Sequence, residues 1–185
     1  LLLMSNDTLV ASDFLTELTA VAEEGRYELI GPAIFYREKP DHVWFIGNHL
    51  LPGTMIARDP YRGKVDKGQF AAVIEVDFLN GCSLLAHRHV MEKVGRFDTS
   101  FFMYAEEVDF LWRARRAGVR MAAATRAKMW HKISATMQAD KPGSRYLRIR
   151  NQIWVYRRYG TPLQKALMLV FTSLRAAGMA CADLA

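Results

Sequence analysis

Residues 95–118 read GRFDTSFFMYAEEVDFLWRARRAG, and this stretch decides the fold of the second half of the chain. Gly95 ends one predicted helix, an aromatic loop follows, and a second predicted helix begins near Glu106. The first turn of that second helix also carries Glu107 and Asp109. Carboxylates gain roughly 0.3–1 kcal/mol each at a helix N-terminus, because they meet the positive end of the peptide dipoles.

Two interpretations of this acidic turn follow from the residues alone. Adjacent carboxylates repel and raise one another's pKa, so one of the three acids is a candidate to accept a proton in a reaction. Alternatively, the acids only offset the helix dipole, and Asp109 pairs with Arg113 four residues later. We predict that Asp109 makes this pair and is structural.

The chain has 185 residues, of which 51% are apolar, and this is enough to bury one substantial core. The two cysteines, Cys82 and Cys181, are too few for a disulfide framework and suit a reducing compartment. Nothing at the start resembles a signal peptide. Because the chain opens within an apolar run and without a methionine, we expect it to be a fragment.

Positive charge is concentrated near the end of the chain. Residues 1–125 hold 14 Lys and Arg against 17 Asp and Glu, whereas residues 126–185 hold 11 against 2. Such a segment suits nucleic acid, an anionic lipid surface or a diphosphate, and the alternative is a solvated basic helix. No nucleic-acid reading motif accompanies the charge, so we expect no nucleic-acid partner.

Apolar periodicity and breaker residues predict the remaining elements. Helices are predicted at residues 13–24, 87–94 and 145–159, and strands at residues 1–4, 27–36, 43–46, 71–78 and 119–124. The interruption at Gly31-Pro32 predicts either an edge strand or a bulge. Residues 47–68 are predicted to be mainly a long loop.

Asp7 follows the first predicted strand, a buried one, in the turn formed by residues 5–8. In α/β sheets, ligands gather at the C-terminal ends of the strands, so Asp7 is well placed to hold a metal ion. The alternative is that Asn6 and Asp7 form an ordinary turn or cap.

Five segments resemble, in order, the second half of family 2 glycosyltransferases, in the rhamnosyltransferase-like branch. They are residues 81–85, 94–98, 102–109, 113–118 and the pair Trp130-His131. The resemblance implies an α/β catalytic domain of the GT-A type, with a mixed sheet flanked by helices. It covers residues 1 to about 151, so the upstream part that grips the nucleotide is expected to be missing. We expect residues 1–140 to be a partial catalytic domain and residues 141–185 a basic, amphipathic helical segment.

The resemblance also implies catalytic and metal-binding residues. The family's general base is the second acid of a pair at the start of this helix, where Glu107 stands with Glu106 before it. Asp7 occupies the last position of the family's metal-binding motif, although Ser5 stands where Asp or Asn is usual. The expected cofactor is Mg²⁺ or Mn²⁺, bound with the diphosphate of a nucleotide-sugar donor. His131 then approaches the metal or the diphosphate, and the alternative is a packed core histidine.

Four further residues are expected to bind substrate by the same resemblance. The turn containing Gly81 and Cys82 lies beside the donor sugar and the acceptor, together with Asp77. Asp77 is alternatively a structural carboxylate that fixes the loop. Arg150, in a pair with Asn151 that resembles an Arg-Asn pair of the family, reaches the donor phosphates or closes the site.

The last predicted helix starts at Thr161-Pro162 and carries an apolar stripe, with Arg175 near its middle. A charge at that depth disfavours a membrane-spanning helix. An interfacial helix beside an anionic lipid surface is expected instead, and the alternative is a helix packed on the domain.

These features predict an inverting, metal-dependent glycosyltransferase that moves a sugar such as rhamnose to a polysaccharide or lipid-linked glycan acceptor. We expect it to be cytoplasmic and peripheral on the inner face of the plasma membrane, and the isolated 185 residues to turn over little. The alternative function is an inactive fragment that acts as a basic membrane-surface binding module.

Overall fold

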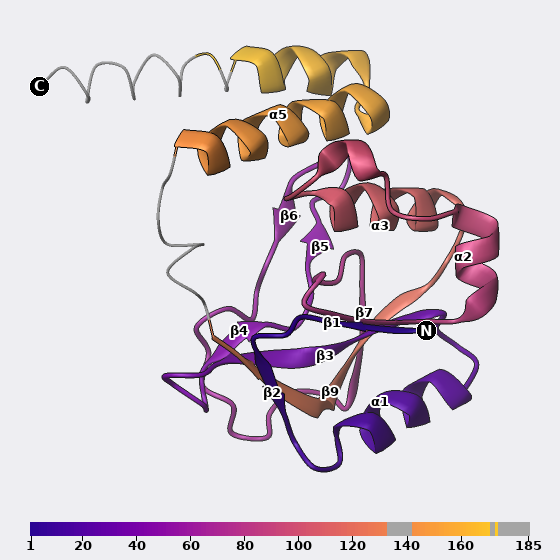
Figure 1. Ribbon diagram of the computed structural model, residues 1–185, viewed down its shortest axis with the longest axis vertical. Coiled ribbons are helices and arrows are strands. Elements are labelled where there is room, and N and C mark those ends of the chain that lie inside the picture. Colours follow the sequence, from indigo (N-terminus) through magenta and orange to yellow (C-terminus); the bar gives the residue numbers. More distant parts are fainter. Residues whose placement is uncertain (133–141, 171–172, 174–185) are drawn as a thin grey trace, which may run out of the picture.

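The computed structural model describes residues 1–132, 142–170 and 173. A seven-stranded mixed sheet forms its centre, with β1, β8, β3, β9 and β2 in spatial order, β4 beside β3, and β7 beside β9 (Figure 1). The strands are β1 Leu2–Met4, β2 Thr8–Val10, β3 Leu29–Tyr36, β4 Val43–Phe45, β7 Val73–Val76, β8 Ser83–Ala86 and β9 Met121–His131. The helices are α1 Phe14–Glu23, α2 Arg88–Val94, α3 Glu106–Arg116 and α5 Pro142–Tyr159, and residues 162–170 are also helical.

Strand direction brings several chain segments together at the C-terminal ends of β1, β3 and β9. β3 and β9 are parallel, whereas β8 is antiparallel to both β3 and β1. β1, β3 and β9 therefore run in the same direction, and their C-terminal ends lie on the side of the sheet where β8 begins. Asp7, the turn before Ser83, and His131 lie on this side.

Two sequence predictions about strands are resolved by this topology. The interruption at Gly31-Pro32 is a bulge, because β3 is a central strand and its register with β9 shifts between Pro32 and Ala33. The predicted first strand is present as β1, but the prediction that it is buried was wrong, since β1 is an edge strand and Met4 is 43% exposed. A run of four apolar residues does not distinguish an edge position from a central one.

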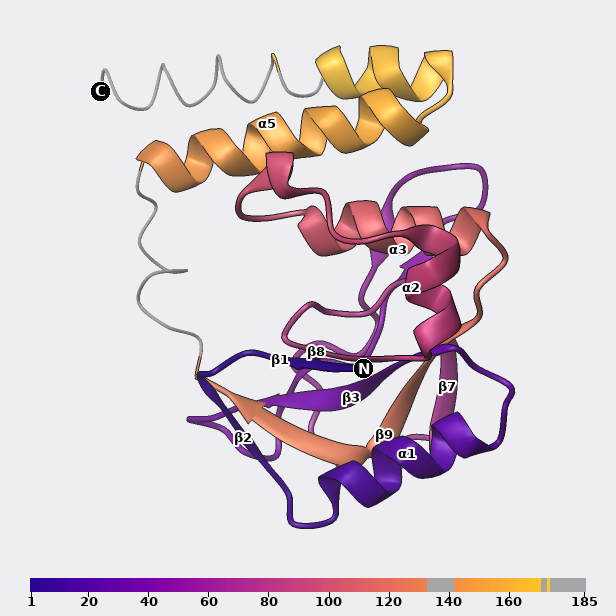
Figure 2. The ribbon, with the colours of Figure 1, turned by 45° about the vertical axis from the view of Figure 1, so that its right-hand side comes forward.

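Helices cover both faces of the sheet, as the predicted mixed sheet flanked by helices requires. α1 packs on one face, where Phe14, Leu18 and Val21 are buried with apolar residues of β3 and β9. α2 and α3 cover the other face, where Phe110 and Leu111 join the second core cluster (Figure 2). α5 lies beyond α3, on the side of α3 away from the sheet.

The region between Gly47 and Gly68 is mostly irregular, as predicted, but it also contains a short two-stranded ladder. β5 His49–Leu50 pairs with β6 Ala57–Arg58 in antiparallel fashion. α5 begins at Pro142, three residues before the predicted start of the helix at residues 145–159, and ends at Tyr159 as predicted. Lys141, Arg175 and Cys181 lie outside the described residues. Within the described ranges, no helix is long and apolar enough to cross a bilayer.

Candidate functional site

A carboxylate and an imidazole lie close together at the C-terminal ends of β1 and β9. Asp7 Oδ2 lies 3.2 Å from His131 Nε2. The backbone fixes this approach, because Lys132 N donates to the Asp7 carbonyl at 3.1 Å and β2, directly after Asp7, pairs Thr8 with His131. Asp7 and His131 are thus brought together from opposite ends of the sheet-forming sequence.

His131 is buried, with 3% of its surface exposed, and its ring centroid lies 4.8 Å from that of Trp44. Its Nδ1 atom is buried without a hydrogen-bond partner among the described residues. The histidine is therefore packed, as one interpretation of the sequence expected. It also presents Nε2 to a carboxylate, as the other interpretation requires.

Cys82, directly before β8, lies beside the Asp7–His131 pair. Its Sγ lies 3.8 Å from His131 Nε2, and its carbonyl accepts a hydrogen bond from Ser5 N at 2.8 Å. Burial raises the pKa of the Cys82 thiol to about 11, with the charges of Asp7 and Glu107 adding to the effect. The thiol is thus close to both carboxylates and stays protonated at neutral pH.

Gly81 brings the turn before β8 against the start of α3. A Cβ atom added at Gly81 would lie 3.3 Å from Glu107 Cβ, which is closer than ordinary van der Waals contact. Because a larger residue would push the two segments apart, the glycine allows the close approach. The Gly81-Cys82 turn therefore has Glu107 on one side and the Asp7–His131 pair on the other.

Glu107 is the acid in the site with an altered affinity for protons. Burial raises the pKa of Glu107 from its usual value to about 7, and the negative charge of Glu106 adds to the shift. Glu106 Oε2 is buried without a hydrogen-bond partner among the described residues. A carboxyl with a pKa near neutrality is suited to exchange a proton with a substrate at physiological pH.

The loop before these acids has an unusual backbone. Phe102, Tyr104 and Ala105 have positive φ angles of 61°, 67° and 64°, a conformation that side-chain-bearing residues rarely adopt. Such residues cost of order 1–3 kcal/mol each and persist only where the surroundings impose them. The sequence predicted a stiff aromatic loop here but gave no sign of this conformation.

The side chain that imposes the conformation comes from α5. Asn151 is completely buried, and its Nδ2 lies 3.0, 2.7 and 2.6 Å from the carbonyl oxygens of Phe101, Met103 and Tyr104. Arg150 assists, because its Nη2 donates to the Phe101 carbonyl at 3.0 Å. We call Arg150 and Asn151 the loop clamp.

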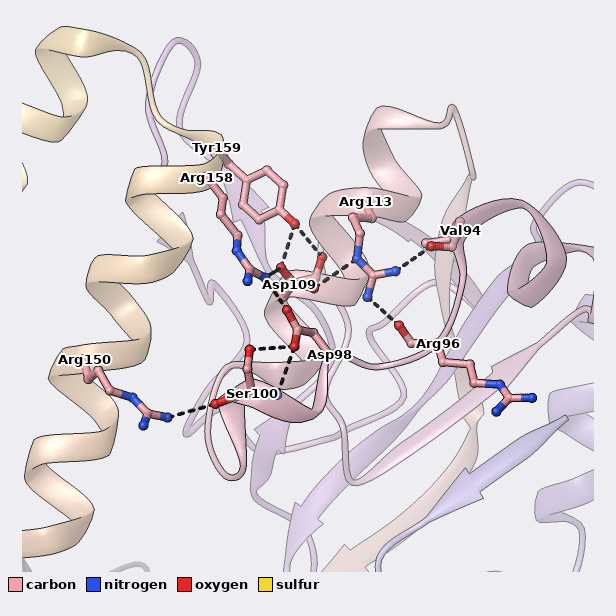
Figure 3. Close-up of polar contacts among 9 residues, drawn as sticks. All are labelled: Val94, Arg96, Asp98, Ser100, Asp109, Arg113, Arg150, Arg158 and Tyr159. Carbon is pink, nitrogen blue, oxygen red and sulfur yellow. Dashed lines mark hydrogen bonds and ion pairs between the residues drawn. The ribbon is translucent and has the colours of Figure 1, made fainter.

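Arg150 was expected to reach the donor phosphates or to close the site. Its guanidinium contacts the loop, including the Ser100 carbonyl at 3.2 Å (Figure 3), and lies 4.5 Å from the Trp154 ring centroid. These contacts place Arg150 behind the acidic turn, where it supports the loop that carries Glu106.

Asp109 has an environment opposite to that of Glu107. It is 1% exposed and accepts hydrogen bonds from Arg113 Nε at 3.0 Å, Arg158 Nη1 at 2.8 Å and the Tyr159 hydroxyl at 2.7 Å (Figure 3). The predicted structural pair with Arg113 is confirmed. The sequence did not indicate the two partners from α5, because they are about 50 residues away.

Asp77 lies away from the other candidates. It follows β7, which ends beside Met121 at the start of β9, whereas His131 ends β9. Its carboxylate bonds Arg115 and accepts from Leu50 N at 2.7 Å. These contacts are those of the structural carboxylate that the sequence left open as an alternative.

The structure thus brings Asp7, Cys82, His131, Gly81 and Glu107 to one place and leaves Asp77 elsewhere. Within the described part of the chain, no group of three or more His, Cys, Asp or Glu side chains is arranged to hold a metal ion. Asp7 and His131 form a carboxylate–imidazole pair without a third such side chain among the described residues.

Fold and site define an α/β domain with a mixed sheet, in which a candidate proton acceptor lies across a short turn from a carboxylate–imidazole pair. The model of the family described as "Glycosyl transferase family group 2" matches residues 1–185, and the chain belongs to this family. The chain is also similar to the "Low-salt glycan biosynthesis hexosyltransferase Agl10" of Haloferax volcanii, with 27% identity over 128 residues. This similarity covers 65% of the chain and 38% of the length of the relative.

Proposed function

We propose that this chain supplies the acceptor-activating part of an inverting glycosyltransferase that uses a nucleotide-sugar donor. The observation that carries the proposal is that Glu107, with a pKa of about 7, contacts the same Gly81-Cys82 turn as the Asp7–His131 pair. Sugar transfer needs a base for the acceptor hydroxyl and a group that stabilises the leaving diphosphate, and candidates for both contact this one turn. Membership of the glycosyltransferase family supports the assignment.

Glu107 acts as general base in this proposal. The acceptor hydroxyl attacks the anomeric carbon of the donor sugar and gives its proton to the Glu107 carboxylate. The new carbon–oxygen bond forms as the bond to the diphosphate breaks, and the diphosphate leaves with the electron pair. One displacement of this kind inverts the anomeric configuration. Glu106 contributes by raising the pKa of Glu107 through its charge.

Asp7 and His131 fit as protein ligands of Mg²⁺ or Mn²⁺. A carboxylate oxygen of Asp7 and an imidazole nitrogen of His131 lie 3.2 Å apart. Carboxylate oxygens and imidazole nitrogens both serve as ligands of divalent metal ions in proteins. With two protein ligands, the donor diphosphate and water would complete the coordination. When bound, the cation would neutralise charge on the departing diphosphate.

The acceptor in this proposal is a polysaccharide or a lipid-linked glycan, and the donor sugar is a hexose or rhamnose. The similarity to a protein named as a glycan-biosynthesis hexosyltransferase supports the glycan part. The basic residues of the C-terminal segment support a peripheral position on an anionic membrane, on the cytoplasmic face of the plasma membrane.

A screen of nucleotide sugars with Mg²⁺ or Mn²⁺ tests the proposal, using the chain completed at its upstream end. Glu107→Gln should reduce transfer by about 10²–10⁴-fold, the usual range for loss of a general base. Asp7→Ala should abolish the response to the cation. Glu92→Gln, at an exposed acid of α2, is the matched control and should leave transfer unchanged. Undiminished transfer by Glu107→Gln would refute the role of Glu107.

The second candidate function is a basic membrane-surface module without catalysis. Exposed Leu163 and Leu167, close in sequence to the arginines of α5, favour it. Liposome co-sedimentation that persists in a Glu106→Gln/Glu107→Gln variant, together with no transfer by the completed chain, would support this module over the enzyme.

A further inference from the structure

A cavity of about 900 Å³ lies directly beside the acidic turn. Its walls come from the segment 53–57, the start of α3, α5, and the helix at 162–170. This volume is at the upper end of the range of roughly 300–1,000 Å³ that is typical of ligand pockets. Neither the proton acceptor nor the metal-binding pair accounts for it.

The position of the cavity ties it to the reaction. Tyr104 and Ala105 line it immediately before Glu106, and Val108 lines it immediately after Glu107. A molecule bound here is therefore held within one helical turn of the proposed base. Glu106 and Glu107 do not line the cavity themselves, and Asp7 and His131 do not line it either.

The lining is mainly apolar. Leu163 and Leu167 project from one wall with 69% and 60% of their surfaces exposed, and Ile56 on another wall is 53% exposed. Val155 and Met168 are buried behind them. Polar side chains, among them Thr54, Gln152 and Gln164, also line the cavity. Large apolar side chains that line a cavity and remain this exposed nevertheless favour a ligand with a hydrocarbon part over a sugar alone.

One cation stands among these apolar side chains. Arg148 lines the cavity, and its guanidinium carbon lies 5.3 Å from the centroid of the Tyr104 ring. Of the described residues that line the cavity, Arg148 alone carries a charge. An arginine suits a phosphate group, which it binds through paired hydrogen bonds.

We propose that this cavity binds the lipid carrier of the acceptor, a hydrocarbon chain that ends in a phosphate ester. The chain lies along Leu163 and Leu167, the phosphate contacts Arg148, and the attached sugar extends past Ala105 to Glu107. This inference rests on the proposed function, because it identifies the substrate class of the same site.

Binding of farnesyl phosphate to the 185-residue chain, below the concentration at which the lipid forms micelles, tests the proposal without turnover. The Leu163→Gln/Leu167→Gln variant should bind the probe at least about tenfold more weakly, since two apolar contacts are lost. The matched control is Leu169→Gln/Val170→Gln, which alters equally exposed residues of the same helix outside the cavity. It should change the affinity by less than about twofold, and the same loss in both variants would overturn the proposal in favour of a general membrane-binding face.

The phosphate contact is tested separately. Arg148→Gln should weaken binding of farnesyl phosphate by about tenfold and leave binding of farnesol unchanged. Arg157→Gln, at an exposed arginine of α5 outside the cavity, is the control. Inorganic phosphate alone should not compete at matched concentration. Equal binding of farnesol and farnesyl phosphate by the unchanged protein would overturn the assigned role of Arg148.

Failure of this inference is distinguishable from failure of the proposed function. Glu107→Gln should retain full affinity for farnesyl phosphate, because the cavity walls are intact, while it loses sugar transfer. Transfer activity without farnesyl phosphate binding would overturn the carrier site and leave the enzyme. Dimerisation of the chain that is abolished by Leu163→Gln/Leu167→Gln would also overturn it, since a second copy would then occupy the cavity.

Discussion

Glu107 and Asp109 stand two residues apart in the first turn of α3, yet their surroundings are opposite. Asp109 is enclosed by Arg113, Arg158 and the Tyr159 hydroxyl, so its charge is compensated. Burial raises the pKa of Glu107 to about 7, and the charge of the neighbouring acid Glu106 adds to the shift. The comparison separates a carboxylate that stabilises the fold from one that can exchange a proton.

The largest expected effect separates the two acids by stability. Asp109→Asn should lower the free energy of unfolding by about 1–3 kcal/mol, because it leaves two arginines facing a neutral side chain in a partly buried place. Glu107→Gln should not lower it, because it removes an uncompensated acid. Thermal or urea unfolding of the two variants measures the difference. Equal destabilisation would show that both acids are structural.

The loop clamp gives the next largest effect. Asn151→Ala should reduce kcat by about tenfold or more while KM for the donor changes little, because the turn that presents Glu107 loses its contacts to Phe101, Met103 and Tyr104. The pH at half-maximal activity should also move, since the burial that raises the pKa of Glu107 is relaxed. Steady-state kinetics of the completed chain, from about pH 5 to about pH 9, measure both quantities. Arg157→Gln, on the same helix, is the control; a change in stability alone would contradict a positioning role.

The raised pKa of Glu107 predicts how stability depends on pH. Between the usual carboxyl pKa of 4.5 and about 7, the folded protein retains a proton at Glu107 that the unfolded chain releases. The contribution of this group to stability is therefore present at low pH and is lost as the pH rises through this window. Sugar transfer should increase through the same window, because the base must be deprotonated.

Urea unfolding of the unchanged chain and of Glu107→Gln, measured at several pH values from roughly 4.5 to roughly 8, checks this prediction. The stability difference between the two proteins should change with pH in the sense given above. A difference that is constant across the range would mean that Glu107 titrates normally.

The smallest expected effect concerns Asp98, a third carboxylate near the same turn. Hydrogen bonds from Ser100, together with Arg158 at 2.7 Å, lower the pKa of Asp98 to about 2. Its contribution is present at neutral pH and is lost as the pH falls from its usual pKa of 3.8 towards about 2. Asp98→Asn should cost about 1 kcal/mol or less at neutral pH, because the pair is near the surface. A larger loss, measured by urea unfolding, would make Asp98 a second structural centre alongside Asp109.

Local features of this comparison were predictable from the sequence. The spacing of Asp109 and Arg113 predicted their ion pair, because residues four apart lie on one helix face. Gly95 marked the end of α2 correctly, and it has a positive φ. The mixed sheet with helices on both faces also agrees with the predicted fold class.

Features that depend on long-range contacts were not predictable. Arg158, Tyr159 and Asn151 reach the acidic turn from α5, and no local pattern connects them to it. The edge position of β1 depends on how β8 pairs, which a short apolar run does not reveal. The choice between two roles for Asp77 needed its contacts with Arg115 and Leu50. The roles assigned to Glu107, Asp7 and His131 stay predictions.

The contact of Asn151 with the left-handed loop has a practical consequence for engineering. A protein shortened to residue 132 would keep every strand of the sheet and all of α3, yet it would lose the amide that fixes Tyr104 and its neighbours. Reporter fusions and domain exchanges that treat α5 as a disposable tail would thus release the turn that carries both glutamates. A transplant of residues 1–132 into another protein should therefore include α5 as well.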